Sequence, residues 1–259
     1  MTDFLLLTLY APLASWGDIA VGETRGSWDR PSRSAILGLL GAALGLTREQ
    51  QDDHDRLDAG YGVAVRLDAA GVPLSDYHTA QTVGASIVNK ARPRTRAQLL
   101  GRPPHERETI LSRRAYRQDA LATVAIWARA GARWSLSELA DALRRPAYVP
   151  YAGRKANPFG APLDPQIVSS ETLAGAFAQR APAPRGIDAS RLDLRSDARC
   201  EIAHDPIGPA DGFSSGLRPF RRDVRRDVPA HRGRWQFAER VVEVALMEAR
   251  GAPLAGGAS

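Results

Sequence analysis

A short apolar run followed by a capped amphipathic segment is the pattern that most constrains how this chain folds. Residues Phe4 to Tyr10 are apolar and are followed by Pro12, which favours a buried strand over a helix. Residues Ser32 to Gly45 then carry apolar side chains at helical spacing, with Ser32 or Ser34 available as the N-cap and Gly45 as the stop signal. A strand followed by a helix therefore opens the fold.

Three further segments extend this order. Residues Tyr61 to Leu67 and Leu121 to Ala128 have the composition of strands. Residues Ser135 to Arg144 are predicted as a helix, with Ser135 or Ser137 at its cap. The order strand, helix, strand, strand, helix is that of a ferredoxin-like (RRM-like) sheet, so the predicted fold class is α+β.

The second part of the chain differs in composition from the first. Beyond Tyr151 it consists of proline-rich connectors around one helix near Ser170 to Gln179, and the β-prone run from Trp235 to Met247 is expected to return to a sheet. We expect a ferredoxin-like RNA-binding domain over residues 1–155, with an insertion at about 80–118, and a smaller β-rich region over residues 156–259.

The insertion between the second and third predicted strands carries most of the charge asymmetry. From Ser86 to Gln118 nine residues are basic and two are acidic, and Lys90, Arg92, Arg94 and Arg96 alternate with uncharged residues. In an extended arm these four side chains would share one side. We therefore predict a protruding basic thumb hairpin, against the alternative that the charge run is only a solvated surface.

Net charge and residue choice favour an anionic partner. The 35 Lys and Arg residues against 29 Asp and Glu residues give a net charge of +6, and only Lys90 and Lys155 are lysines. Arginine grips phosphate with two hydrogen bonds and stacks on bases, which suits RNA. A base-composition bias in the genome accounts for the Arg:Lys ratio equally well. The positions of the arginines in the sequence must therefore decide between RNA binding and this bias. A second basic stretch runs from Arg218 to Arg234.

The sequence shows no motif for a disulfide, a metal site, a membrane span or a known catalytic site. The single Cys200 excludes an intramolecular disulfide and a cysteine-cluster zinc site, and it indicates a reducing, cytoplasmic compartment. No apolar run reaches the ~20 residues of a membrane span, and the apolar start lacks the basic flank of a signal peptide. Phosphate-loop, His-x-Glu and nucleophile-elbow motifs are absent, so we expect no catalytic residue, no metal and no cofactor.

Several blocks, taken in order, resemble a known family. They are Leu5–Gly17 (LLLTLYAPLASWG), Thr24-Arg25, Pro31–Gly45 (PSRSAILGLLGAALG), Asp76–Thr79 (DYHT) and Pro150–Lys155 (PYAGRK). Together they resemble the CasD subunits of type I-E CRISPR Cascade, which belong to the RAMP superfamily. The resemblance runs from residue 4 to about 163 and returns weakly near residues 234–242. Any one block alone would be weak evidence for the family, whereas the blocks in this order are highly specific for it.

The resemblance implies a fold and a role. It implies a ferredoxin-like domain with a thumb and a smaller β-rich domain, in a non-catalytic subunit that caps the 5′ handle of the guide RNA (crRNA). The implied partners are this handle, the Cascade backbone subunits and the large subunit, with target DNA reached through the complex and no membrane. This chain departs from the pattern in a longer, more basic insertion after Thr79 and in the stretch from Arg218, so contacts there do not carry over.

Candidate RNA contacts begin at the first predicted helix. Free backbone N–H groups, the hydroxyl of Ser34 and the guanidinium of Arg33 would hold a phosphate there, with Arg25 and Arg30 in the preceding loop. The alternative is ordinary capping of the helix by a serine. Trp16, beside a strand end, is predicted to lie in the core.

The other candidates lie along the arm and in a later turn. Tyr77, His78 and Thr79 supply a stacking ring, an imidazole and a hydroxyl at the root of the arm. Gly153 lets the basic pair after it approach a phosphate, unless that turn is only a solvated loop. The remaining residues predicted to contact RNA are Lys90, Arg92, Arg94, Arg96, Arg113, Arg114, Tyr151, Arg154 and Lys155.

Two other functions compete with a binding subunit. A metal-independent endoribonuclease that cuts CRISPR repeat RNA needs a base, an acid and a cation on the phosphate, which Tyr77, His78 and Lys90 or Lys155 would supply. A type I-E system is expected to carry a separate processing nuclease, which removes that need. A small-molecule enzyme on a ferredoxin-like sheet comes last, because no motif for one is present.

Overall fold

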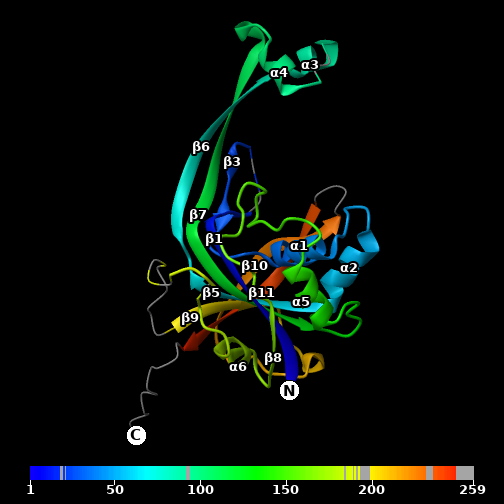
Figure 1. Ribbon diagram of the computed structural model, residues 1–259, viewed down its shortest axis with the longest axis vertical. Helices are drawn as coiled ribbons and strands as arrows, with labels where there is room; N and C mark the ends of the chain where they lie inside the picture. Colours follow the sequence, from blue (N-terminus) through cyan, green and yellow to red (C-terminus); the bar gives the residue numbers. More distant parts are fainter. Residues whose placement is uncertain are drawn as a thin grey trace.

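A large antiparallel sheet with few helices forms the body of the protein, an α+β arrangement (Figure 1). The structure, a computed structural model, describes residues 1–17, 20, 22–91, 94–183, 185–188, 190, 192, 199–231 and 236–248. Within these residues one sheet has nine strands, of which seven follow the order β10-β11-β9-β5-β7-β1-β8. The strands β3 and β6 each pair with β7 outside that path.

Four strands and two helices make up the centre. The strands lie in the order β8-β1-β7-β5, each antiparallel to its neighbour. Helix α1 follows β1 along the chain, and helix α5 lies between β7 and β8. The bounds are β1 Thr2–Ala14, α1 Arg33–Leu44, α2 Gln51–Gly60, β5 Tyr61–Ala69, β7 Arg107–Ala128, α5 Leu136–Arg144 and β8 Gln166–Ser170.

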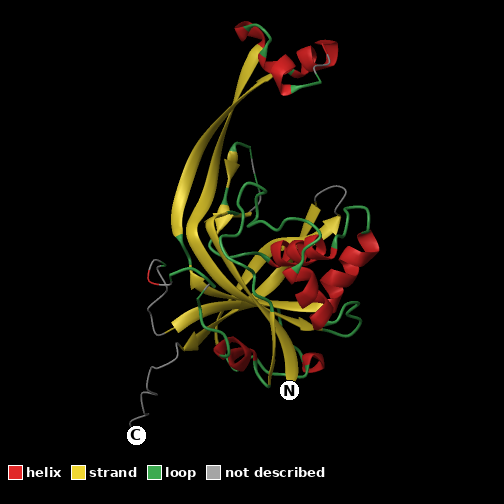
Figure 2. Cartoon of the chain, in the orientation of Figure 1, coloured by secondary structure: helices red, strands yellow, loops and turns green. Residues whose placement is uncertain are grey.

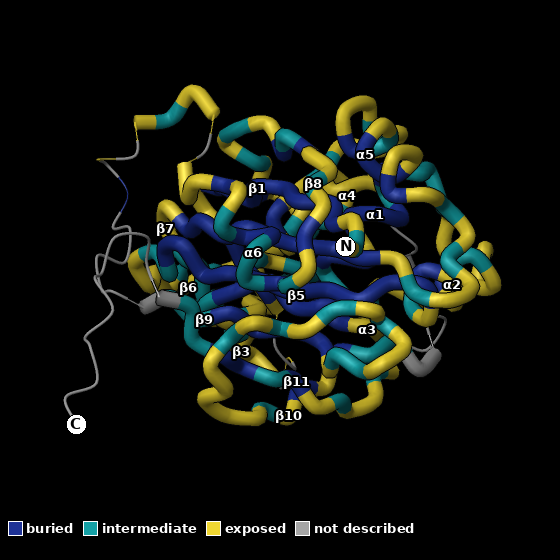
Figure 3. The backbone as a smooth tube through the Cα atoms, turned by 90° about the horizontal axis from the view of Figure 1, so that it is seen from below, coloured by how far each residue is buried: buried dark blue, intermediate teal, exposed yellow. Residues whose placement is uncertain are grey.

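Each face of the sheet has its own apolar core. Helices α1, α2 and α5 gather on one face (Figure 2), where Leu7, Leu40 and Leu139 are fully or almost fully buried. Phe4 and Trp127 pack on the opposite face with helix α6 (Leu173–Ala178). Seen from below, the buried residues follow β1, β5 and β7 through the middle of the molecule (Figure 3). Trp16 belongs to the first core and is 4% exposed, as predicted.

Local caps define the two predicted helices. The Ser32 side chain accepts a hydrogen bond from the Ala35 backbone N–H at 3.2 Å, and Gly45 ends α1 with a φ of 76°. Ser135 and Glu138 form a capping box at the start of α5. These contacts satisfy backbone groups that a helix end leaves open, which is why α1 begins and ends, and α5 begins, where the sequence predicts.

A long two-stranded arm, residues 72–118, projects from the body (Figure 1). Strand β6 (Val72–Val83) pairs with the first half of β7 along its whole length. Short helices lie at the tip, and β3 (Thr24–Arg25) pairs in parallel with the other edge of β7. The tip helices are α3 (Ala85–Ala91), α4 (Arg96–Leu100) and the 3-10 helix η1 (Pro104–Glu106).

The predicted extended run from residue 90 to 96 is wrong. Lys90 lies in α3 and Arg96 begins α4, while Arg92 lies outside the described residues. Thr95 accepts a hydrogen bond from the Gln98 backbone N–H at 3.2 Å and so caps α4. The extended strand that a same-side alternation requires is therefore absent from the described part of this run.

The later part of the chain adds strands to the same sheet. Strand β9 pairs with both β5 and β11, and β11 pairs with β10. The bounds are β9 Arg199–His204, η3 Pro209–Asp211, β10 Arg218–His231 and β11 Gln236–Glu248. The run predicted as a strand near the end of the chain is therefore a strand within the sheet, and the division at residue 155 stays a prediction. A separate two-stranded sheet joins β2 (Trp16–Gly17) to β4 (Ser27–Trp28).

Candidate nucleic-acid interface

The arm is a ribbon with two distinct faces. Side chains directly opposite in an antiparallel pair share a face, and successive side chains along a strand alternate. Tyr77 is paired with Arg113, whereas His78 is paired with Ser112. Tyr77 and Thr79 therefore lie on one face and His78 on the other. The structure does not bring the predicted Tyr77-His78-Thr79 group together.

Basic side chains converge at the root of the arm. Parallel pairing of β3 with β7 puts Arg25 beside Arg114. The guanidinium of Arg154 lies over the ring of Tyr116, 4.5 Å from its centroid, and its Nη2 donates to the Arg25 carbonyl at 3.4 Å. We call Arg25, Arg114, Tyr116 and Arg154 the root cluster. Residues up to 129 positions apart in the sequence thus meet in one place.

The root cluster is positively charged, and the carboxylate opposite Arg114 in the strand register, Asp76, is paired with His78. Within the described ranges, no carboxylate forms an ion pair with Arg25, Arg114 or Arg154. Arg114 donates to the Ser112 hydroxyl at 3.2 Å, and Nη1 of Arg154 is buried without a hydrogen-bond partner among the same residues. A buried guanidinium nitrogen that lacks a partner is costly, and an anionic oxygen would relieve that cost. The arrangement can bind phosphate.

A tight turn delivers Arg154 to this place. Gly153 has a φ of 82°, and a Cβ atom on it would collide with the Ser15 carbonyl oxygen. The turn therefore needs glycine on two grounds, the left-handed backbone and the lack of space. Tyr151 and Lys155, on either side, are both exposed and available to a ligand.

At the predicted anion site at the start of α1, Arg33 is bonded to acidic residues of the same chain. Arg33 is 7% exposed, and its Nε donates to Asp205 at 2.9 Å, while Nη1 is paired with Asp58. The carboxylate of Asp227 accepts from the Arg33 backbone N–H at 3.0 Å, so the chain's own acid occupies the end of the helix. Burial would lower the pKa of Arg33, but Asp205 and Asp58 raise it above its ordinary value.

Arg30 and Ser34 are also engaged within the chain. Arg30 is 3% exposed and donates to Asp29 and, at 2.6 Å, to Glu201. Ser34 is hydrogen-bonded to the Ser32 hydroxyl at 3.0 Å. Of the four candidates around the first helix, only Arg25 is exposed. The carboxylates that engage Arg30 and Arg33 come largely from β9, β10 and the residue after β9.

The tip of the arm presents separate cations. Arg94 and Arg96 are exposed there, at the opposite end of the ribbon from the root cluster (Figure 1). Arg102 is paired with Glu106 at 2.6 Å, which neutralises one of the basic residues of the insertion. The tip and the root are thus two separate basic regions on one arm.

Sequence reasoning missed Tyr116 and the structural role of Trp28. Tyr116 stands two residues after Arg114 in the same strand, and this spacing of two was the available signal for a shared face. The ring of Trp28 lies under Arg225, 4.1 Å from its guanidinium carbon. That contact joins β10 to the segment that leads into α1.

The described residues offer neither a metal centre nor a membrane-spanning helix. They contain no group of three or more His, Cys, Asp or Glu side chains placed to hold a metal ion. No helix among them has both the length and the apolar character needed to cross a membrane.

The sequence as a whole matches one family model. The model is described as CRISPR-associated protein (Cas_Cas5), and it matches residues 4–243, which include the body, the arm and β10. The chain belongs to the Cas5 family of CRISPR-associated proteins.

Relatives of this Cas5 chain agree with that assignment. The CRISPR system Cascade subunit CasD of Escherichia coli (strain K12) is 36% identical over 171 residues, which are 63% of this chain and 70% of the relative. A chain of a CRISPR RNA-guided surveillance complex superposes with a TM-score of 0.64 at 26% identity, covering 95% of this chain and 90% of that one. A structure titled as a Cas protein shares the fold, with a TM-score of 0.54 at 22% identity and 95% coverage of each chain.

Proposed function

We propose that this Cas5 chain is a non-catalytic subunit of a CRISPR surveillance complex and binds the 5′ handle of the guide RNA. The observation that carries the proposal is the root cluster, where the Arg154 guanidinium lies over the Tyr116 ring and the strand pairing puts Arg25 beside Arg114, with no ion pair from these three arginines to a carboxylate of the described residues. Arginine forks suit phosphate oxygens, and an aromatic ring beside them suits an unpaired base. The similarity to a Cascade subunit supports guide RNA as the ligand.

The body supports a ferredoxin-like description. A sheet in the order β8-β1-β7-β5, with helices after the first and third strands in sequence, has the connectivity of the βαββαβ fold. Such a sheet leaves the ends of its strands free to continue, and here β7 runs on into the arm. In our proposal the arm acts as a thumb that lies along the RNA, with Tyr77 and Arg113 on one face and Arg114 on the other.

The proposed partners follow from the same similarity. In this proposal the RNA handle is held at the root cluster, and the arm, which projects from the body (Figure 1), is available to contact neighbouring backbone subunits and the large subunit. Target DNA is contacted only through the assembled complex. The single cysteine of the chain fits action in the reducing cytoplasm.

Geometry disfavours the nuclease alternative. A base and an acid must both reach the same phosphodiester, within hydrogen-bond distance of the groups they serve. Tyr77 and His78 lie on opposite faces of the arm, and the ion-pair partner of His78 is Asp76 on its own strand at 3.9 Å. The proposed base and acid, Tyr77 and His78, therefore do not face one phosphodiester together.

The experiment measures RNA binding by the purified subunit and its variants. Fluorescence anisotropy with repeat-derived single-stranded RNA is recorded over a salt series for wild type, Arg25→Ala and Arg154→Ala. A charge-assisted hydrogen bond is worth ~1.5 to 3 kcal/mol, so each variant should lose about tenfold or more in affinity. The slope of log affinity against log salt should become shallower by about 0.7 for each phosphate that the variant no longer neutralises.

The matched control is Arg222→Ala. Its side chain is 76% exposed on β10, outside the root cluster, and the substitution removes the same charge. We expect the control to keep wild-type affinity. If Arg25→Ala, Arg154→Ala and Arg222→Ala lost the same RNA affinity, net charge alone would explain the effect. Unchanged affinity and salt slope in Arg25→Ala and Arg154→Ala would overturn the proposal.

A further inference from the structure

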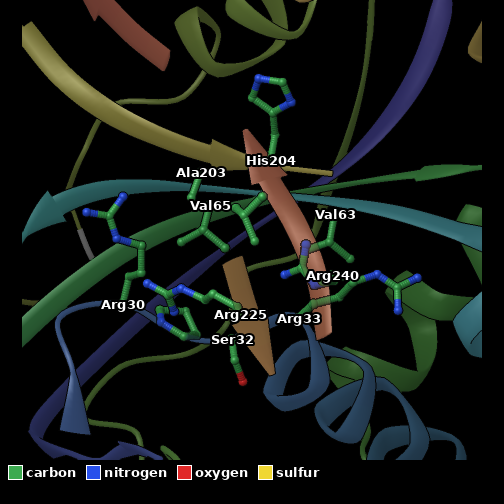
Figure 4. Close-up of a pocket in the computed structure, with 11 residues that line it drawn as sticks. Arg30, Ser32, Arg33, Val63, Val65, Ala203, His204, Arg225 and Arg240 are labelled. Carbon is green, nitrogen blue, oxygen red and sulfur yellow. The ribbon is translucent and has the colours of Figure 1, made fainter. Parts of the chain in front are cut away.

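A small cavity lies between the start of α1 and the strands that face it (Figure 4). Its volume is about 20 Å³, which suits one water molecule or one monoatomic ion and nothing larger. The lining residues come from the loop before α1, from the first residue of α1 and from β5, β9, β10 and β11. The cavity belongs to neither the arm nor the root cluster.

The polar lining is almost entirely cationic. Arg30, Arg33, Arg225 and Arg240 line the cavity together with apolar and other residues, and none of its lining residues in the described part of the chain is a carboxylate. Arg30 and Arg225 stand on one side and Arg33 and Arg240 on the other (Figure 4). A guanidinium offers hydrogen-bond donors and no acceptor. A ligand that only accepts therefore matches this lining better than water, whose two hydrogens also need acceptors.

Arg30 has unused donor capacity at this place. Only 3% of its surface is exposed, its Nε and Nη2 each donate to Asp29 at 3.0 Å, and Nη2 also donates to Glu201 at 2.6 Å. Its remaining nitrogen, Nη1, is buried without a hydrogen-bond partner in the described part of the chain. A buried charged donor without a partner costs more than a neutral one, so a nearby acceptor is favoured.

Arg225 differs from Arg30, which forms ion pairs with Asp29 and Glu201. Arg225 is buried, lies over the Trp28 ring, and forms no ion pair or hydrogen bond with a carboxylate in the part of the chain that the structure describes. Burial lowers its pKa, and the positive charge of Arg30 lowers that pKa further. Asp29 and Asp227 act in the opposite direction, but burial and the neighbouring arginine charges outweigh them, so the pKa of Arg225 stays below its ordinary value.

The start of α1 does not itself supply the site. Its first backbone N–H, on Arg33, already donates to Asp227. Asp227 also accepts from Arg240 at 2.7 Å, so these groups hold β10 and β11 against the helix. The unused donors are on the other side of the cavity, with Arg30 and Arg225.

We propose that this cavity binds a single halide ion between Arg30 and Arg225. The ion accepts hydrogen bonds, neutralises the repulsion between the two guanidinium groups and fills a space that the side chains leave open. Because Arg30 precedes α1 and Arg225 lies in β10, the bound ion fastens the C-terminal hairpin to the body. Binding of the ion to the folded chain alone raises its melting temperature by mass action.

The experiment compares anions at equal ionic strength. Melting temperatures are measured for the full chain in sodium chloride, sodium bromide and sodium gluconate, since gluconate is too large for the cavity. Wild type should show a rise in chloride and bromide over gluconate that saturates with concentration. Arg225→Gln should lose that difference, and Arg222→Gln, which changes an exposed arginine of the same strand, should keep it.

Crystals grown in sodium bromide give a second, independent result. Anomalous diffraction should show a bromide peak in the cavity of the wild-type protein beside Arg30 and Arg225. Water density without a bromide peak would overturn the proposal, even where Arg225→Gln fails to fold. An equal halide-dependent rise in Arg225→Gln and wild type would overturn it as well.

Discussion

Replacement of Arg33 by alanine should unfold the protein more readily and should not act through RNA. The Arg33 side chain donates to Asp205 and to the Tyr61 carbonyl and is also paired with Asp58. Asp205 is almost fully buried, whereas the side chain of Asp58 is one-third exposed and can regain water. The lost stability therefore comes mainly from Asp205 and from the backbone carbonyls that accept hydrogen bonds from Arg33.

The size of the effect follows from burial. Removing one partner of a buried ion pair costs about 3 to 5 kcal/mol, because the other charge stays in a medium of low polarity. Arg240 still donates to Asp205 at 2.7 Å, which places the expected cost towards the lower end of that range. At roughly 2 to 4 °C per kcal/mol, the melting temperature should fall by about 6 to 20 °C.

Urea unfolding followed by tryptophan fluorescence measures this loss as a free energy. Arg222→Ala is the control, because an exposed arginine on a strand should change stability by at most about 0.5 kcal/mol. The reasoning would be refuted if Arg33→Ala kept the wild-type free energy of unfolding and lost tenfold or more in RNA affinity. Arg33 would then be a ligand contact, as the serine- and arginine-rich sequence before the helix suggests.

Three further outcomes are expected. Gly153→Ala should lose ~2 kcal/mol or more of stability together with RNA affinity, because the new Cβ meets the Ser15 carbonyl in a left-handed turn; an unchanged melting curve would contradict this. His78→Ala should leave the ends of guide RNA from the complex unaltered, and wild-type cleavage of repeat RNA that this variant abolishes would show a nuclease. Burial alone would raise the pKa of Glu201, but hydrogen bonds from two arginines hold it below its ordinary value, so its stabilising effect is complete at neutral pH and is lost as pH falls through the lowered pKa. Acid titration of Glu201→Gln should show less loss over that range than wild type.

Elements with local signals were predictable from the sequence. Helix α1 carries its cap and its stop within its own segment, and β1 is a continuous apolar run. Helix α2 was missed because its residues are mostly polar and only Leu57 and two other residues of the helix are buried. Strand β6 was missed because it pairs with β7 outside the core, so neither of its faces is apolar in the way that a core strand is.

The site depends more on distant pairing than the fold does. Arg33 looks like a phosphate ligand in the sequence, yet its partners Asp205 and Asp227 lie 172 and 194 residues further along the chain. No local pattern reveals such carboxylates. Arg25 and Arg114 were both predicted as contacts, but their adjacency comes from the parallel pairing of a two-residue strand with β7. The sequence thus indicates which side chains are able to bind a phosphate, whereas the tertiary structure decides which of them are exposed to a ligand.

The most direct test of the central claim is recovery of guide RNA from the assembled complex. The subunit is expressed with its neighbouring proteins and a repeat array, purified through a tag, and the RNA that remains bound is sized and quantified. Wild type and Arg222→Ala should retain one discrete guide RNA with a defined 5′ end, and the combined Arg25→Ala, Arg114→Ala and Arg154→Ala variant should lose it or leave that end open to nucleases. Full retention and protection in the combined variant, with all proteins present, would contradict the account.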